Sequence, residues 1–306
     1  MQEVSAAVLE MIRAHVPAED ILEYEPMSMH TTFRVGGNAL CLVKISSEQQ
    51  LFKLIPYFNQ VEIPYFILGN GSNLLVGDRG YAGIILQLKE KFASIECDGE
   101  RICAKAGALM SQVAQQAMEN SLEGMAFASG IPGTIGGGVM MNAGAYGGEM
   151  KNIVENVKVM DENGEILILD NETMEFGYRS SIIKNRKFIV LEVTLKLKKG
   201  NKEEIRKEME ELAAKRREKQ PLNYPSAGST FKRPEGYFAG KLVMDAGLRG
   251  FSIGGAGVSE KHCGFVINKG NATAADVTEV ISEVQERVKE RFGVTLEREV
   301  IYLGDF

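Results

Sequence analysis

A glycine-rich segment from Ser129 to Glu149, SGIPGTIGGGVMMNAGAYGGE, limits what this chain can fold into more than any other feature. It contains eight glycines and a single charged residue. Because glycine loses more conformational freedom on folding than any other residue, such a cluster indicates a disordered linker, tight turns, or backbone lying against a ligand. The segment lacks the Ser, Glu, Lys and Gln enrichment of a linker, so the last two interpretations are kept.

The composition is that of an ordinary globular protein. The chain has 306 residues, of which 44% are hydrophobic and 25% charged, enough for two or three compact domains. A formal net charge of −6 argues against a general nucleic-acid surface. An anionic ligand would therefore have to be held by locally clustered Lys and Arg.

Cysteine usage and the first residues bear on the cellular compartment. The four cysteines have no CxxC spacing and form no ligand set with the three histidines, which favours scattered buried thiols over a metal site or disulfides. The opening segment has neither a basic region nor an uninterrupted apolar run, so we expect no signal peptide. No apolar run is long enough to span a bilayer. These features predict a cytoplasmic protein.

The hydrophobic pattern predicts a mixture of helices and strands without strict βαβ alternation, which is an α+β fold. A very polar helix near 199–221, with Ile205, Met209 and Leu212 on one face, is expected to connect two domains. We further expect helices at 4–15, 47–60 and 108–121, and a helix that begins at the Thr273–Asp276 capping box and ends at Gly293. The expected β-structure is a strand, a glycine turn and a strand within 33–45, apolar β-rich segments cut by glycine at 65–78 and 83–88, a hairpin across 154–170, and strands at 101–107, 187–199 and 294–304.

Two glycine loops could bind phosphate. Gly69-x-Gly71 fails as a dinucleotide fingerprint because Leu74 occupies the place of the third glycine, and no P-loop or nucleophile elbow is present. Consecutive N–H groups in glycine turns can nevertheless form concave sites for phosphate oxygens. Together the two loops could hold a dinucleotide pyrophosphate from two sides. For either loop alone, a plain turn between strands is the favoured interpretation.

Several ordered motifs closely resemble one family, the UDP-N-acetylenolpyruvoylglucosamine reductases, over nearly the whole chain from Thr31. A single one of these motifs would be weak, but their shared order makes the resemblance specific. They are TTFRVGG (31–37), ILGNGSNLL (67–75), the segment 129–149, FGYRSS (176–181), SAGSTFKRP (226–234), DAGLRG (245–250), KHCGFVINKGNATAADV (261–277) and EREVIYLG (297–304).

The resemblance implies a fold and a domain division. It implies a two-subdomain FAD-binding fold of the vanillyl-alcohol-oxidase (PCMH) type, followed by a smaller α+β substrate-binding domain. We place FAD-binding subdomains at 1–88 and 89–200 and the substrate domain at 201–306, with the final strand returning to the active site. Because YRSS leads almost directly into the next strand, the chain resembles the shorter subfamily, which lacks a tyrosine-bearing insertion over the substrate.

The resemblance also implies a reaction. NADPH reduces non-covalently bound FAD, and the reduced flavin then delivers hydride to the enolpyruvyl group of UDP-N-acetylglucosamine enolpyruvate, giving UDP-N-acetylmuramate for peptidoglycan synthesis. Ser229 matches the proton donor, Arg179 the arginine that favours the enolate-like intermediate, and Glu299 the acid that assists at the same carbon and must be protonated to do so. No second nucleotide fold remains for NADPH, which implies a shared cleft and ping-pong kinetics.

Binding residues follow from the same motifs, and no metal is implied. Tyr146 is expected to face the substrate, with a core tyrosine as the alternative, and Lys232, Arg233 and Asn268 are candidates for the UDP diphosphate and sugar. The expected FAD contacts are Gly69, Asn70, Gly71, Ser72, Asn73, Leu74, Pro132, Gly133, Thr134, Gly136, Gly137, Gly144 and Ala145.

Two other functions stay open from the sequence. One is a flavin oxidase of the same fold acting on a sugar or alcohol, in which flavin is frequently attached through His or Cys; the glycine loops contain neither. The other is a binding module without catalysis, which would be expected to lack Arg179, Ser229 or Glu299. We expect a monomer that binds a UDP-sugar and NADPH, and neither nucleic acid nor membrane.

Overall fold

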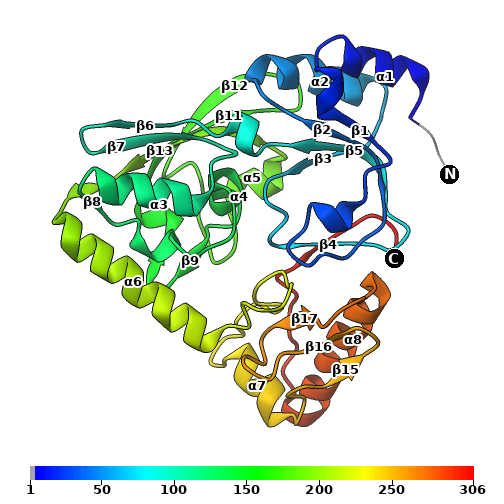
Figure 1. Ribbon diagram of the computed structural model, residues 1–306, viewed down its shortest axis with the longest axis vertical. Coiled ribbons are helices and arrows are strands. Elements are labelled where there is room, and N and C mark those ends of the chain that lie inside the picture. The colour runs from blue at the N-terminus through cyan, green and yellow to red at the C-terminus, as the bar shows by residue number, and fades with distance from the viewer. Residues whose placement is uncertain (1–3) are drawn as a thin grey trace. The chain divides into compact units, whose positions relative to one another are not determined.

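The computed structural model describes residues 4–306 (Figure 1). Contacts within the chain group it into two compact units, each with its own hydrophobic core. Within the described residues, unit 1 comprises 4–23, 41–70 and 83–216, and unit 2 comprises 24–40, 71–82 and 217–306. The boundaries proposed at residues 88 and 200 divide the chain along its sequence and stay predictions.

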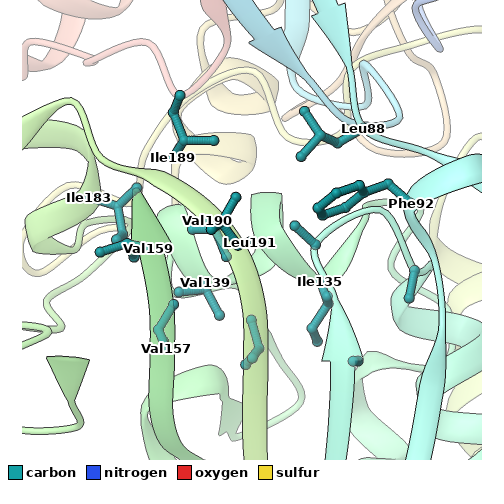
Figure 2. Packing of buried hydrophobic residues seen from close by; sticks show 14 of the residues in the cluster. Leu88, Phe92, Ile135, Val139, Val157, Val159, Ile183, Ile189, Val190 and Leu191 are labelled. Atoms are coloured by element: carbon teal, nitrogen blue, oxygen red, sulfur yellow. The ribbon is translucent and has the colours of Figure 1, made fainter. Parts of the chain in front are cut away.

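A five-stranded antiparallel sheet forms the centre of unit 1, in the order β12-β11-β13-β7-β6. Helices α3 and α4 pack against it (Figure 1). Figure 2 shows side chains from α4, β11, β13 and the Leu88–Phe92 segment gathered in one apolar cluster. The elements are β6 (Ile95–Asp98), β7 (Arg101–Lys105), β11 (Val154–Met160), β12 (Ile166–Asp170), β13 (Ile189–Lys196), α3 (Met110–Glu119), α4 (Ile135–Met140) and α5 (Ile182–Arg186).

The N-terminal part of the chain also contributes a four-stranded sheet in the order β1-β2-β5-β3. Strands β3 and β5 run parallel, with Tyr65 opposite Ile84. The remaining elements of this part and of the rest of unit 1 are α1 (Ala6–Arg13), β1 (Ile21–Glu23), β2 (Ala39–Lys44), α2 (Glu48–Gln60), β3 (Tyr65–Leu68), β5 (Tyr81–Gln87), and the short pairs β8 (Leu122–Glu123) with β14 (Lys198–Lys199) and β9 (Gly144–Ala145) with β10 (Gly148–Glu149).

Unit 2 is built around α8, which packs against a three-stranded antiparallel sheet, β15-β16-β17. A separate pair of strands, β4 and β18, runs parallel, with Leu74 opposite Ile301. Helix α6 (Lys202–Lys219) contains the boundary between the units at Arg216. The other elements are β4 (Leu74–Val76), α7 (Ala239–Asp245), β15 (Ser252–Ile253), β16 (Ala256–Val258), β17 (Val266–Asn268), α8 (Ala274–Phe292) and β18 (Ile301–Leu303).

Elements defined by local sequence are confirmed. The Thr273 side chain accepts a hydrogen bond from the Asp276 N–H and the helix ends at Gly293 with φ of +70°, as the capping box and terminal glycine predict. The expected hairpin is formed by β11 and β12. Strand β13 is almost entirely buried rather than half-buried, because it lies in the middle of its sheet.

Three local predictions are wrong. The segment Phe33–Val35 is irregular rather than a strand, and its apolar side chains instead enter the core of unit 2. The strand expected over 294–304 is interrupted: Ile301–Leu303 pair with β4, whereas before them Arg298 forms only an isolated bridge with Phe231. The thiols are not all buried: Cys97 is exposed and Cys103 half-buried. Of the helices described, none combines the length and the apolar character needed to cross a bilayer.

Candidate functional site

The start of the first glycine loop, Gly69 and Asn70, lies against the second loop in unit 1, whereas Gly71–Leu74 belong to unit 2. The Nδ2 of Asn70 donates to the carbonyl oxygen of Pro132 at 2.6 Å. A Cβ at Gly69 would lie 2.4 Å from the Oγ1 of Thr134, so only glycine permits this approach. Thr134 is also the N-cap of α4, where its Oγ1 accepts a hydrogen bond from the N–H of Gly137 at 3.4 Å.

Backbone amides of both loops lack acceptors in the protein. Within residues 4–306, the N–H groups of Gly69–Asn73, Gly133 and Thr134 donate no hydrogen bond to a protein group. Amides in folded segments are normally paired, and consecutive unpaired ones form a concave site for an anion. Gly71 adopts φ of +61°, and a Cβ there would lie 2.2 Å from the carbonyl oxygen of His30. Each loop therefore offers amides that fit phosphate oxygens such as those of FAD.

The three consecutive glycines of α4 differ in what surrounds them. A Cβ at Gly136 would lie 2.9 Å from the Cβ of Ala106, and one at Gly138 would lie 2.6 Å from the sulfur of Met110. The N–H of Gly136 also donates to the carbonyl oxygen of Ala106 at 3.0 Å, so this amide is already engaged. Gly137 is exposed, and a Cβ there would meet only a Thr134 Oγ1 at 3.6 Å. Packing thus explains two of these glycines without a ligand.

Tyr146 and Arg179 lie on two neighbouring turns in unit 1. Tyr146 and Gly147, at φ of +53° and +91°, form the two-residue turn of hairpin β9–β10. Tyr146 is 45% exposed, which excludes the core-tyrosine alternative. Arg179 also has a positive φ, +53°, and its Nη2 donates to the carbonyl oxygen of Gly144 at 3.4 Å. A non-glycine residue in this conformation costs about 1–3 kcal/mol and frequently marks a functional site.

Ser229 and Glu299 belong to one short antiparallel ladder in unit 2. Phe231 pairs with Arg298, and the N–H of Glu299 donates to the carbonyl oxygen of Thr230 at 2.8 Å. Ser229 is exposed and Glu299 half-buried. Glu299 precedes β18 rather than lying within the terminal strand that the sequence predicted.

The backbone of this ladder is fixed on both sides. Buried Thr230 accepts at its Oγ1 from the N–H of Val266 at 2.9 Å and donates its own N–H to the carbonyl oxygen of Gly264 at 2.8 Å. On the other strand, the Nδ2 of Asn73 donates to the carbonyl oxygen of Glu299 at 3.0 Å. Asn73 therefore joins the first glycine loop to the segment carrying Glu299. Sequence analysis missed Thr230 as an anchor, since its partners are distant in the chain.

The proposed diphosphate ligands Lys232 and Arg233 have protein partners. Lys232 forms an ion pair with Glu297 at 3.0 Å, and the Nε of Arg233 donates to the carbonyl oxygen of Tyr237 at 3.2 Å. The guanidinium of Arg233 also lies 4.0 Å from the centre of the exposed Phe238 ring. Both side chains are at least partly solvent-accessible, so a ligand can reach them.

Asn268 is buried and its side chain bonds to the backbone. Its Nδ2 donates to the carbonyl oxygen of Phe33 at 3.2 Å, and its Oδ1 accepts from the N–H groups of Gly270 at 2.9 Å and Ala272 at 3.3 Å. These contacts favour a role in holding the loop after β17. Its expected contact with the substrate stays a prediction.

A cavity of about 760 Å³ in unit 2 was not predicted from the sequence. It is positively charged on balance, because three cations outnumber a single carboxylate. Two of its cations lie in the motif 261–277, but the third lies more than forty residues earlier, so no single local segment defines the cavity. They are Arg217, Lys261 and Lys269, with Glu260 as the carboxylate and Tyr224 as an aromatic wall.

His262 follows one of these cations but is not a charged ligand. Burial lowers the pKa of its imidazole, which favours the neutral form at pH 7. Its Nδ1 accepts a hydrogen bond from the N–H of Gly264 at 3.1 Å. His262 therefore orders the loop before β17.

Two family models match the chain. The FAD-binding domain model matches residues 39–170, so the class defined by the fold and the amide-lined loops is an FAD-binding protein. The model for the C-terminal domain of UDP-N-acetylenolpyruvoylglucosamine reductase matches residues 220–303. Together with the relatives described next, this shows that the chain belongs to the UDP-N-acetylenolpyruvoylglucosamine reductase family.

The relatives match along nearly their whole length. The reductase of Caldanaerobacter subterraneus subsp. tengcongensis is 54% identical over 92% of this chain and 93% of its own, and that of Clostridioides difficile 51% identical over 94% of each. The crystal structure of the reductase (MurB) from Thermus caldophilus is 36% identical, with a TM-score of 0.79 over 92% of this chain and 98% of its own.

A more distant neighbour shares only the fold. The glucose dehydrogenase Phl p 4.0202 is 14% identical, with a TM-score of 0.51 over 64% of this chain and 44% of its own. The expected α+β fold, with an FAD-binding domain followed by a further domain that matches the C-terminal domain of the reductase family, is confirmed.

Proposed function

We propose that this chain reduces UDP-N-acetylglucosamine enolpyruvate to UDP-N-acetylmuramate, a precursor of peptidoglycan, with Arg179, Ser229 and Glu299 acting on the reacting group. The observation that carries the proposal is the ladder holding Ser229 and Glu299, which Asn73 ties to the amide-lined loop. A proton donor and an acid are thereby fixed to the same segment that would bind the cofactor.

FAD, when bound, accepts electrons from NADPH and supplies hydride to the vinyl carbon of the enolpyruvyl group. The carbon–carbon double bond opens toward the carboxylate, and the hydroxyl of Ser229 gives its proton to the neighbouring carbon, completing the lactyl ether. Arg179 holds the carboxylate through its forked N–H donors, which favours the enolate-like charge distribution. Glu299 hydrogen-bonds to the same region from the opposite strand of the ladder.

Cofactor and substrate contacts are proposed for the remaining residues. The loop Gly69–Leu74 and the loop around Pro132–Thr134 would hold FAD without a covalent bond, with Gly137, Gly144 and Ala145 beside them. The engaged amide of Gly136 favours a packing role for that residue.

The UDP part of the substrate needs cations, and unit 2 offers them. Lys232 and Arg233 remain the proposed diphosphate ligands, and the cationic cavity with Arg217, Lys261 and Lys269 is a second place where a nucleotide diphosphate would be attracted. Tyr146 is proposed to contact the substrate. The KM for the sugar nucleotide in a Lys232→Ala variant tests the diphosphate assignment.

An anaerobic absorbance experiment tests the proposed function. We expect the purified protein to be yellow. Its flavin absorbance near 450 nm should fall when NADPH is added and should recover when the enolpyruvyl sugar nucleotide is added. Bleaching of the oxidised flavin by a simple sugar or alcohol and recovery of the colour on admitting O₂, without response to the sugar nucleotide, would instead favour a flavin oxidase. A protein that stays colourless after reconstitution with FAD would contradict both.

A pair of glycine variants tests the proposed cradle. Gly137→Ala is expected to stabilise the FAD-free protein by about 0.5–1 kcal/mol, because alanine is the better helix residue and its Cβ would meet only the Thr134 Oγ1, at 3.6 Å, in otherwise open space. It should nevertheless weaken FAD binding, since that space is where the cofactor would lie. Gly136→Ala should destabilise by about 1–3 kcal/mol through overpacking against Ala106.

Thermal unfolding of the FAD-free protein and FAD titration separate these effects. Unchanged FAD affinity in Gly137→Ala would remove Gly137 from the cradle, and unchanged stability in Gly136→Ala would contradict the packing explanation.

The cellular setting follows from the substrates. Because both the UDP-sugar and NADPH are cytoplasmic metabolites, we propose that the protein acts in the cytoplasm, as a monomer. Cell fractionation and sedimentation of the FAD-loaded protein test these two points.

A further inference from the structure

The buried side chain of Asn142 links three segments of unit 1. Its Nδ2 donates to the Oε2 of Glu149 and to the carbonyl oxygen of Gly177, both at 3.0 Å. Its Oδ1 accepts from the N–H of Lys151 at 2.9 Å. The side chain is 2% exposed and φ is +41°, so both its donors and its acceptor are used in a conformation that asparagine tolerates.

One of these bonds reaches the turn that carries Arg179. The N–H of Gly177 donates to the carbonyl oxygen of Ser180 at 3.0 Å, which closes a two-residue turn over Tyr178 and Arg179. The carbonyl oxygen of Gly177 accepts from Asn142 at the base of this turn. A second bond, from the buried hydroxyl of Ser181 to the carbonyl oxygen of Met140, fixes the chain just after it.

The other bonds of Asn142 reach the hairpin that Arg179 contacts. Glu149 is the last residue of β10, whose partner strand β9 carries the Gly144 carbonyl oxygen that accepts from the Arg179 guanidinium. Asn142 is therefore bonded both to the turn that presents Arg179 and to the hairpin against which Arg179 lies.

We infer that Asn142 is a positioning residue for the reduction: it sets the place of the Arg179 guanidinium relative to hairpin β9–β10. This inference rests on the role proposed for Arg179 in holding the substrate carboxylate. A guanidinium displaced by about 1 Å would meet the carboxylate poorly, and displacements of that size can cost about 100-fold in rate.

The test compares two isosteric substitutions. Asn142→Asp keeps the acceptor for Lys151 and the tolerance for positive φ, but places an oxygen against two acceptors. Asn171→Asp is the matched control, because Asn171 donates to the carbonyl oxygens of Lys151 and Val154 and, within residues 4–306, forms no hydrogen bond to the Arg179 turn. Asn142→Gly, which also accepts positive φ, serves if the aspartate variant does not fold.

Two readouts decide the matter. In the FAD-loaded enzyme, Asn142→Asp should lower kcat about 10- to 100-fold. In an Arg179→Ala background the same substitution should change kcat by no more than about twofold, because the effects of coupled residues are not additive. Amide hydrogen exchange at 177–181 should be faster in Asn142→Asp than in wild type, and unchanged in Asn171→Asp.

Each contrary result has a separate meaning. Equal losses of kcat with and without Arg179, or unchanged exchange at 177–181, would overturn the positioning role of Asn142. Full activity of Arg179→Ala alone would contradict the proposed function of Arg179 instead, and exchange would still report whether Asn142 holds the turn.

Discussion

Replacing Ser229 by alanine is expected to separate the two halves of the reaction. Flavin reduction by NADPH should stay within about twofold of wild type, while reoxidation by the enolpyruvyl sugar nucleotide should fall about 100- to 10,000-fold, the range for loss of a positioned proton donor. The fold should tolerate the change, because Ser229 is exposed and its hydroxyl bonds to no protein group within the described residues. Anaerobic stopped-flow absorbance measures both steps.

Ser226→Ala is the matched control for this experiment. Ser226 lies in the same SAGS loop, and its hydrogen bonds to Thr32 are made by the backbone, so alanine preserves them. Both half-reactions should remain near wild type in this variant. Unchanged reoxidation in Ser229→Ala would remove Ser229 from the chemistry, and equal losses in the two variants would indicate a disturbed loop.

Loss of the Arg179 guanidinium is expected to have the second largest effect. Arg179→Ala should lower kcat/KM for the sugar nucleotide about 100- to 1,000-fold, the range for loss of one group that stabilises developing charge. Arg179→Lys should recover only a minor part, because an ammonium cannot make the two parallel hydrogen bonds of a guanidinium to a carboxylate. Steady-state rates over a range of sugar nucleotide concentrations measure the effect.

Arg186→Ala provides a comparison on the same unit. Arg186 is an exposed residue at the end of α5, and its loss should leave kcat/KM within about twofold. If Arg179→Lys retained full activity, a simple positive charge would suffice and the forked contact with the carboxylate would be wrong.

The parts of the fold that were predicted correctly are those fixed by nearby residues. Helix α8 carries its start signal at Thr273 and its stop signal at Gly293, and both act within one turn. The strand prediction for the residues just before β18 was wrong because an alternating pattern of apolar and polar residues also occurs in extended segments that join no sheet. The residues that pair are decided by distant partners: β4, more than two hundred residues earlier, pairs with Ile301–Leu303, and Phe231 forms the isolated bridge with Arg298.

Among the residues of the candidate site, too, those defined by local sequence could be predicted and those that depend on distant partners could not. The glycine loops could be recognised because unpaired amides need flexible backbone, a local property. Asn142 and Thr230 could not, since their partners, Gly177 and Val266, are over thirty residues away. Some of these glycines are also required by packing, which the sequence alone does not reveal: Gly138, for example, leaves room for the sulfur of Met110.

Because unit 2 is built from three separate segments of the chain, the segment matched by the C-terminal family model is shorter than the part that forms its hydrophobic core. The C-terminal family match begins at residue 220, yet the core of unit 2 also contains Phe33, Val35 and Leu75. A fragment cut at that match would lose these three side chains and leave an apolar gap where they pack. We therefore expect that residues 220–303 do not fold on their own. A chimaera that takes this domain from one protein to another would need residues 24–40 and 71–82 as well.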